Sequence, residues 1–380
     1  MKEGWEYRKL KECCKELFAG GDVPKPDVSK NKTYHFSVPI YTNGVENEGL
    51  YGYTSNARVN EPAVTISARG TIGAIFRRYT PFFPAIRLIT AVPQKDLLSV
   101  DYLYYSLKTL TVGNSGTSIP QLTIPNIKNI YIPIPPLSEQ QSIVDYLDSA
   151  FTKIDAMKTN AEKRLNEAKT LFQASLKEML EPKEGWEYKE LGKVCDIVGG
   201  GTPDTKNKEY WRGNIPWATV SDMNCDIIKS TGYYITEKGL NESSSRIIKK
   251  GEIIIATRVG LGKVCKLAVD TAINQDLKGV IPKDNSILRD FIFYYFKHKA
   301  KYIVDNGIGA TVKGVKIKFI EGLSFAFPSL SEQQSIVATL DSLKSKVDRL
   351  QENYEKISQE CDALKQSILR QVFDYNNYFS

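Results

Sequence analysis

The octapeptide Leu137-Ser-Glu-Gln-Gln-Ser-Ile-Val144 decides the fold, because the chain repeats it without change at Leu330–Val337. Both copies continue to Leu-Asp-Ser after two further residues, and proline stands one or two positions upstream of each. A polar stretch that follows proline and precedes apolar residues is typical of a helix start. We therefore infer that one half of the chain duplicates the other, and that each half ends in a helix.

Each octapeptide has the spacing of a capping box, in which a serine and a glutamine three residues later satisfy each other's backbone N–H groups. The pairs are Ser138 with Gln141 and Ser331 with Gln334. Such a cap stabilises a helix by only about 1 kcal/mol, so it fixes where the helix begins and not whether it forms. We predict helix starts at Ser138 and Ser331.

The repeat extends well beyond the octapeptide. Glu3–Leu10 reads EGWEYRKL and is matched by EGWEYKEL at Glu184–Leu191, an offset of 181 residues, whereas the octapeptides are 193 residues apart. An offset that grows along the chain, with the order of motifs unchanged, indicates a duplicated half that gained small loop insertions. Because solenoid repeats have only about 20–50 residues, each repeat here is a whole domain with its attachment.

Long heptad patterns follow both octapeptides, and each predicts a helix with a seam for a partner helix. Each helix would run to roughly 40 residues, about 60 Å, which is too long to be buried inside one globular half. We expect the two helices to pair with each other, and pairing between two chains stays open as the alternative. The predicted seam positions are Ile143, Leu147, Ala150, Ile154, Met157, Ala161, Leu165, Ala168, Phe172, Ser175 and Met179 in the first helix, and Ile336, Leu340, Leu343, Val347, Leu350, Tyr354, Ile357, Cys361, Leu364 and Ile368 in the second.

The positive charge is confined to the segments that precede the helices. Residues 1–137 contain 16 basic and 11 acidic side chains, a net charge of +5, and residues 183–330 contain 23 and 17, a net charge of +6. Residues 138–182 and 331–380 each contain 6 and 8, a net charge of −2. These four segments are the predicted domains: two globular halves, each followed by a spacer helix. Basic globular halves predict salt-dependent binding to nucleic acid.

The composition excludes several classes of protein. The chain has 380 residues, 42% hydrophobic and 25% charged, which suits a globular protein with more than one core. No stretch is apolar enough for a signal peptide or a membrane span, so we expect a cytoplasmic protein with no membrane partner. The six cysteines include no C-x-x-C pair, and we expect them to be reduced and to bind no metal. Since the phosphate-binding and nucleophile motifs are also missing, we expect no catalytic residue.

Each globular half is predicted to have an α+β fold. Short apolar segments bounded by glycine, asparagine and proline indicate strands, and residues 100–110 and 287–304 are predicted helices. The predicted architecture is two tandem-repeat globular domains joined by two long antiparallel coiled-coil helices, related by a pseudo-twofold axis. The predicted strands are residues 63–67, 73–77, 85–92 and 130–135 in the first half and 253–258, 263–269 and 323–327 in the second.

Polar, glycine-rich loops at residues 113–121, 199–212 and 307–313 supply most candidates for contact with DNA. Glycine lets the backbone approach a ligand closely, and basic, amide and hydroxyl side chains contact phosphates and base edges. For any one of these residues a solvated surface charge is the commoner explanation. The candidates are Arg69, Arg77, Arg78, Ser118, Gln121, Lys206, Lys208, Arg212, Arg258, Lys313, Lys316 and Lys318.

Two basic halves, each followed by an LSEQQ helix start and a long heptad helix, resemble the specificity subunit of a type I restriction-modification system. The resemblance covers essentially the whole chain, and its most specific part is the tandem signature Pro135–Gln141 (PPLSEQQ) and Pro328–Gln334 (PSLSEQQ). In that family the globular halves are target recognition domains, and each reads one half of a bipartite, asymmetric sequence in double-stranded DNA through the major groove. The paired helices set the distance between the half-sites and dock two modification (methyltransferase) subunits.

The resemblance also implies what this chain does not hold. S-adenosylmethionine and adenine N6 methylation belong to the modification subunit, while ATP, Mg and DNA cleavage belong to the restriction subunit where one is present. The sequence leaves one alternative open, a nucleic-acid-binding coiled-coil scaffold outside any methylation system. A lone methyltransferase is disfavoured, because the chain has neither a glycine-rich cofactor loop nor an Asn/Asp-Pro-Pro-Tyr-like tetrapeptide.

Overall fold

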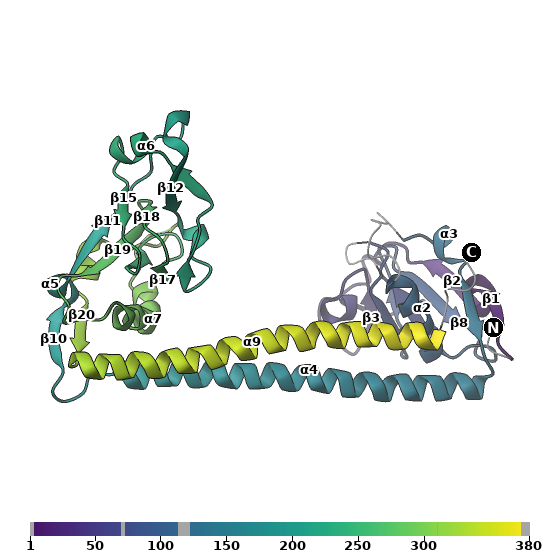
Figure 1. The fold of residues 1–380 in the computed structure, drawn as a ribbon. Helices are drawn as coiled ribbons and strands as arrows, with labels where there is room; N and C mark the ends of the chain where they lie inside the picture. Colours follow the sequence, from purple (N-terminus) through teal and green to yellow (C-terminus); the bar gives the residue numbers. More distant parts are fainter. Residues whose placement is uncertain (1–3, 70–72, 113–121, 310, 374–380) are drawn as a thin grey trace. The chain divides into compact units, whose positions relative to one another are not determined.

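The structure is a computed structural model that describes residues 4–69, 73–112, 122–309 and 311–373, and the chain divides into two compact units. Unit 1 comprises Met1–Glu162 together with Asn353–Ser380, and unit 2 is the continuous segment Lys163–Glu352. Each unit contains a globular part and one end of each long helix (Figure 1). The long helices are α4 (Leu137–Leu180) and α9 (Leu330–Phe373), each of 44 residues.

In unit 1 an antiparallel four-stranded sheet has the order β2-β8-β5-β6. The central strand β5 is buried along its whole length, and its apolar side chains share one core with α2 and with the ends of α4 and α9 that belong to this unit. A second sheet has the order β4-β3-β7, and β1 pairs with β9. The elements are β1 (Glu6–Lys9), α1 (Leu10–Cys13), β2 (Cys14–Ala19), β3 (Val38–Tyr41), η1 (Glu46–Gly49), β4 (Leu50–Thr54), β5 (Ala63–Ile66), β6 (Ile75–Arg78), β7 (Phe83–Pro84), β8 (Ile89–Pro93), α2 (Val100–Val112), α3 (Ile124–Ile127) and β9 (Tyr131–Ile134).

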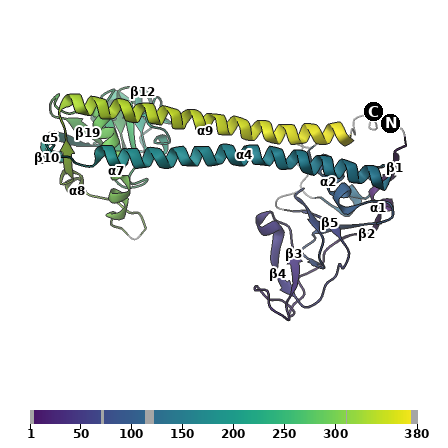
Figure 2. The ribbon, with the colours of Figure 1, turned by 90° about the horizontal axis from the view of Figure 1, so that it is seen from below.

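In unit 2 a five-stranded sheet has the order β11-β19-β16-β17-β13, and a four-stranded sheet has the order β14-β12-β18-β15. Helix α7 is rich in buried aromatic residues, contacts β16 and β17, and shares one core with α4 and α9. Figure 2 shows α7 beside α4. The elements are β10 (Glu187–Glu190), α5 (Leu191–Val194), β11 (Cys195–Gly199), η2 (Lys208–Tyr210), β12 (Trp211–Ala218), η3 (Val220–Asp222), β13 (Ile227–Ile228), β14 (Tyr233–Ile235), α6 (Glu237–Asn241), β15 (Arg246–Ile248), β16 (Ile253–Ala256), β17 (Val264–Leu267), β18 (Thr271–Ile273), β19 (Leu277–Pro282), α7 (Arg289–Asp305), α8 (Ile317–Glu321) and β20 (Ser324–Phe327).

The second glutamine of the octapeptide is fully buried and fastens the helix start to the globular part. In unit 1 the Gln140 amide donates from Nε2 to the carbonyl oxygens of Leu97 (2.8 Å) and Pro135 (2.9 Å) and accepts from the backbone N–H of Ser99 (2.9 Å). In this way one side chain satisfies two backbone groups just before α2 and one just before α4, and an unpaired buried group at either place would be costly.

Unit 2 repeats this arrangement at equivalent positions. Gln333 donates to the carbonyl oxygens of Ser286 (2.9 Å) and Pro328 (3.0 Å) and accepts from the N–H of Leu288 (2.9 Å). The residue is fully buried as well. The duplicated octapeptide therefore serves the same purpose twice, which is to fix a long helix to a globular part.

The predicted capping boxes are wrong. The helices begin at Leu137 and Leu330, one residue earlier than predicted, so Ser138 and Ser331 lie inside the first turn. The Gln141 side chain donates to Asp145 (2.8 Å) and not to the helix start. The local pattern pointed to Gln141 and not to Gln140, because two of the three backbone partners of Gln140 lie 41 and 43 residues away in the sequence.

The other repeated motifs meet at the same junctions. The indole N–H of Trp5 donates to Glu139 (2.9 Å), and that of Trp186 donates to Glu332 (3.2 Å). These contacts bring the EGWEY motif and the octapeptide together in each unit. The Leu-Asp-Ser motifs take part too, because Tyr105 donates to Asp148 in unit 1 and Tyr294 donates to Asp341 (2.5 Å) in unit 2.

Within each unit the long helices contact each other. In unit 1, Lys158 pairs with Asp362 (3.3 Å) and Asp155 with Lys365, so α9 numbers fall as α4 numbers rise and the segments are antiparallel. In unit 2, Lys169 donates to Gln351 (2.8 Å). The seam prediction fails at two positions of unit 1, since Met157 is 59% exposed and Leu364 is 48% exposed.

Candidate nucleic-acid interface

Four loops of unit 2 contact one another, and we call their combined surface the loop face: residues 200–212, 256–263, 274–276 and 307–316, of which residue 310 is outside the described part. The glycines at the start of the first loop allow the closest approach. A Cβ atom on Gly200 would lie 2.2 Å from the carbonyl oxygen of Ile273, and the N–H of Gly201 donates to that oxygen (3.0 Å). The next residue, Thr202, hydrogen-bonds to the Gln275 side chain.

The remaining loops contact one another through Asp276 and Thr257. The carbonyl oxygen of Asp276 accepts from the N–H of Thr257 (2.8 Å), and its carboxylate lies 3.6 Å from Nε of Arg258. The carbonyl oxygen of Thr257 in turn accepts from the N–H of Val315 (2.8 Å). Segments that are up to about a hundred residues apart in the sequence are thereby held side by side by main-chain hydrogen bonds, which give loops a defined shape.

The loop face presents most of the basic residues predicted in the second half. Lys206, Lys208 and Arg212 are exposed on the first loop, and Arg258 and Lys313 are exposed on the loops that contact each other through Thr257. Arg258 keeps 58% of its side chain exposed despite its ion pair with Asp276.

Lys316 and Lys318 lie where the fourth loop enters α8. Lys316 is the N-cap residue of α8, and Lys318 lies within the helix; both are exposed. Lys318 lines a cavity of about 490 Å³ together with Lys299 and Tyr302.

The predicted residues of unit 1 differ in their surroundings. Arg69 is exposed just after β5. Arg77 pairs with Asp101 (2.9 Å) and Asp148 (3.5 Å), so it belongs to the junction between α2 and α4.

Arg78 is only 4% exposed, and its guanidinium group lies 3.5 Å from the centre of the Tyr41 ring and pairs with Glu48 (2.9 Å). Its burial leaves little surface for a DNA phosphate. The two residues predicted to contact bases, Ser118 and Gln121, lie outside the described residues.

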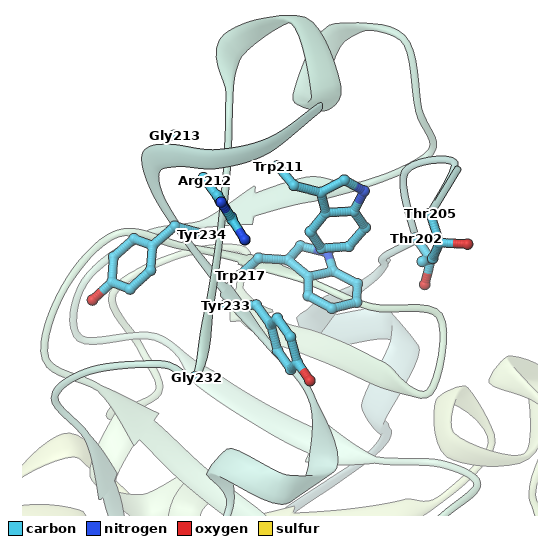
Figure 3. Close-up of a pocket in the computed structure, with 9 residues that line it drawn as sticks. All are labelled: Thr202, Thr205, Trp211, Arg212, Gly213, Trp217, Gly232, Tyr233 and Tyr234. Carbon is cyan, nitrogen blue, oxygen red and sulfur yellow. The ribbon is translucent and has the colours of Figure 1, made fainter. Parts of the chain in front are cut away.

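An aromatic cavity of about 790 Å³ opens beside the first loop of the loop face and was not predicted (Figure 3). Its wall contains Trp211, Trp217 and Tyr233, whose rings meet edge to face with centres 5.1–6.3 Å apart. The three rings gather on one side of the cavity, and the Tyr234 ring points away from them (Figure 3). The sequence contains one indication of the aromatic cavity. Trp5 and Trp186 are matched copies, whereas Trp211 and Trp217 have no counterpart in the first half.

The backbone at the cavity is strained. Arg212 has a φ of +62°, a region that residues other than glycine rarely adopt. The pairing of β12 with β14 is irregular between Trp211 and Ile215, and a Cβ atom on Gly213 would lie 2.2 Å from the carbonyl oxygen of Ile235. Such irregularities turn a side chain out of a strand, and they are common at binding sites.

Other kinds of site are not found in the described part of the chain. No group of three or more His, Cys, Asp or Glu side chains there could hold a metal ion. All six cysteines are free, and five of them are buried. A search of the described helices gives none that is both long and apolar enough to cross a membrane.

A comparison with known proteins gives one match in each half of the internal repeat. The family model for the type I restriction modification DNA specificity domain matches twice, at residues 2–167 and 183–359. The specificity subunit of the type I restriction enzyme EcoR124I/EcoR124II from Escherichia coli is 29% identical over 357 residues, 87% of this chain and 86% of the relative. The MjaIX specificity subunit from Methanocaldococcus jannaschii is 36% identical over 197 residues, 50% of this chain and 44% of the relative.

Two solved structures share the fold. One is a chain solved in work on complex assembly and conformational transition of the type I R-M system; it has a TM-score of 0.80 at 19% identity and covers 98% of both chains. The other is the HsdS subunit from Thermoanaerobacter tengcongensis, with a TM-score of 0.59 at 19% identity, covering 99% of this chain and 98% of the other. At such low identity these likenesses concern the fold alone.

Proposed function

This chain belongs to the family of type I restriction modification DNA specificity subunits, and on that premise we propose that its two globular parts read the two halves of a bipartite, asymmetric site in double-stranded DNA. The loop face is the observation that carries the proposal for the second half. It places seven exposed basic side chains on hydrogen-bonded loops, in a globular segment with a net charge of +6: Lys206, Lys208, Arg212, Arg258, Lys263, Lys313 and Lys316. Basic side chains bind phosphates, and a loop of fixed shape can present neighbouring groups to base edges.

The two kinds of contact should be separable by mutation. Lys206 and Lys208, exposed at the rim of the loop face, are proposed to contact phosphates, which would position the protein without reading sequence. Arg258 is proposed to contact a base edge, because arginine pairs with guanine in a bidentate way.

Catalysis is proposed to come from partners. We propose that two modification subunits, which carry S-adenosylmethionine and methylate adenine, dock on this chain, and that ATP and Mg are bound by restriction subunits where these are present. The chain itself would be non-catalytic and would act in the cytoplasm, where the host DNA is. The support is chemical: the sequence offers none of the phosphate-binding or nucleophile motifs that those reactions need.

Methylation mapping tests the recognition function directly. Single-molecule mapping of the host genome, with and without the gene for this chain, should show one methylated motif that disappears with the gene. The motif should consist of two different short half-sites separated by an unspecified spacer of constant length. A genome in which no motif depends on the gene would contradict the proposal.

Variants of the loop face refine the test. Lys206→Ala with Lys208→Ala should weaken binding to all sequences alike and reduce the dependence of log K on log salt by about 2, roughly one for each phosphate that is no longer neutralised. The control is Lys193→Ala, an exposed lysine in α5, which lies at the opposite end of the globular part from α6 (Figure 1). If both changes have the same effect, the loop face is not the DNA-binding surface.

The mass of the purified complex separates this function from a scaffold role. Co-expression with the modification subunit of the same genome should give a complex of two modification subunits and one specificity subunit. A stable homodimer of this chain that does not bind the modification subunit would favour the scaffold role.

A further inference from the structure

We propose that the aromatic cavity of unit 2 binds one DNA base that has left the base stack. The inference rests on the proposed function, since it adds a ligand to a chain that is taken to read DNA. It assigns the cavity to a single nucleotide, with the base against the tryptophan rings and the phosphate near Arg212.

The indole rings of Trp211 and Trp217 are held so that their aromatic surface faces the cavity. The indole N–H of Trp211 donates to the carbonyl oxygen of Asp204 (3.1 Å), and that of Trp217 donates to the carbonyl oxygen of Gly201 (3.1 Å). These hydrogen bonds satisfy the polar edge of each indole and fix the ring, so what remains toward the cavity is aromatic surface. Stacking on fixed aromatic side chains is the usual means by which proteins hold an unpaired base.

The size and depth of the cavity suit a small ligand and not a duplex. Its volume of about 790 Å³ lies within the range of about 300–1,000 Å³ that is typical of small-molecule sites. Trp217 forms the deepest part, since only 5% of it is exposed, whereas Tyr233 at the rim is 56% exposed. A base that remains paired cannot reach a buried ring, so a base that binds here must be extruded from the helix.

The positive charge at the cavity indicates which class of ligand binds there. An aromatic cavity could also take a quaternary ammonium group, but here the wall includes Arg212, which would repel a cation. Lys206 and Lys208 lie on the same loop, and within the described residues no ion pair is found for either lysine or for Arg212. A planar base linked to an anionic phosphate complements both features, namely the rings and the unneutralised positive charge.

The two tryptophans of the cavity occur in one half of the repeat only. They have no counterparts in the first half, whereas the structural tryptophans Trp5 and Trp186 are matched. A feature confined to the second half can contribute to the difference between the two half-sites. Extrusion is therefore expected only within or next to the half-site that unit 2 reads.

Mismatch scanning of the mapped site tests the inference, with the complete complex of specificity and modification subunits as the protein. Each base pair of a duplex carrying the site is replaced in turn by a mismatch that keeps the base of one strand. At the extruded position a mismatch removes the cost of unpairing, so the wild-type complex should bind about tenfold tighter than it binds the paired duplex. If no position of the half-site read by unit 2, or of its flanks, shows tighter binding, the inference is overturned.

Cavity variants identify the pocket responsible. Tyr233→Ala should lose about tenfold in affinity and lose the mismatch effect, while Tyr233→Phe, which keeps the ring, should behave as the wild type. Arg212→Gly removes the charge and puts glycine at a positive φ, which glycine adopts without steric strain. The matched control is Tyr188→Ala, an exposed tyrosine in β10 that does not line the cavity.

The outcomes separate three possibilities. An adenine extruded into the active site of a modification subunit would show the mismatch effect equally in the wild type and in all cavity variants, and this result would overturn the inference. A chain that keeps its methylation motif but shows no mismatch effect would overturn the cavity assignment and leave the proposed function intact. A chain without any gene-dependent motif would overturn both.

Discussion

A buried glutamine in each octapeptide, Gln140 or Gln333, joins a long helix to its globular part. Burial of a primary amide is unfavourable unless its donors and acceptor are paired, and in both copies the side chain makes three hydrogen bonds to backbone groups. The exposed neighbours Gln141 and Gln334 have the same chemistry without these partners. The pair in each copy is thus a natural comparison between a structural residue and a surface residue.

Replacing the buried glutamine should therefore be costly. Gln333→Leu removes the partners of the Leu288 N–H and of the carbonyl oxygens of Ser286 and Pro328, and each buried group left unpaired costs about 1–3 kcal/mol. We expect a loss of roughly 3 kcal/mol or more in the unfolding free energy of unit 2, measured by urea denaturation. Gln334→Leu should change it by less than about 0.5 kcal/mol. Equal effects of the two substitutions would show that the hydrogen bonds are unimportant.

Asp226 links two helices of unit 2 through opposite charges. Its carboxylate lies 2.6 Å from Nζ of Lys297 in α7 and 3.2 Å from Nζ of Lys344 in α9. Burial by itself would raise the pKa of Asp226, but its hydrogen bond and ion pair with Lys297 and its ion pair with Lys344 outweigh burial and hold the pKa below its ordinary value of 3.8. A folded-state pKa that is lowered stabilises the fold above the unfolded-state pKa.

This stabilisation should be lost in acid. Asp226→Asn should lower the urea midpoint of unit 2 at pH 7, where the wild-type carboxylate is charged in both states. The difference between variant and wild type should persist down to pH 4 and shrink as the pH falls through the lowered pKa, because the wild-type carboxylate then becomes protonated. Denaturation curves at pH 7 and pH 2.5 measure the effect. A difference that is the same at both values would mean that the ion pairs contribute nothing.

At the scale of elements, the long helices depart from a regular heptad seam in unit 1. Met157 and Leu364 point outward, while Lys365 reaches over the Phe151 ring (5.3 Å) and pairs with Asp155. Beyond this point the buried positions of α9 are Leu369 and Phe373. The last turn of α9 therefore packs into the globular core and not along a coiled-coil seam.

The end of α9 should accordingly stabilise unit 1 strongly. Phe373 is fully buried, with its ring centre 5.4 Å from that of Tyr102 in α2. Phe373→Ala should cost about 3–5 kcal/mol, as truncation of a core phenylalanine does. Leu364→Ala, at a half-exposed position on the same helix, should cost less than about 1 kcal/mol. Thermal denaturation of both variants makes the comparison, and a mild effect at Phe373 would contradict the packing described.

At the scale of the whole molecule, the length of the helices is proposed to set the spacer of the DNA site. Deleting residues 160–166 and 354–360 removes one heptad from each helix, about 10 Å at about 1.5 Å per residue. Since stacked base pairs rise about 3.4 Å, the spacer should shorten by about three base pairs while both half-sites stay the same. Methylation mapping of a host that carries the deletion measures this. An unchanged spacer would contradict the role of the helices as a ruler.

The sequence predicts the helices and the central strands well, because these have strong local patterns. The octapeptides place the starts of α4 and α9 within one residue, and buried apolar runs place β5 and β16. Strands such as β12 and β14 were missed, since they mix exposed and buried positions without regular alternation. Among site residues, exposure of the loop lysines agrees with expectation, but the burial of Arg78 depends on Tyr41 and Glu48, which no local pattern reveals.

Unit 1 contains residues from both ends of the chain, and this affects how the protein can fold during its synthesis. Ribosomes make the chain from its N-terminus. Since unit 2 is a continuous segment, it can fold once Glu352 has emerged. The first globular part emerges earliest, yet it has to wait for Leu369 and Phe373 before its interior is filled. A message truncated between codons 353 and 369 would thus yield a finished unit 2 beside an open unit 1, which chaperones and proteases would be expected to treat as incomplete.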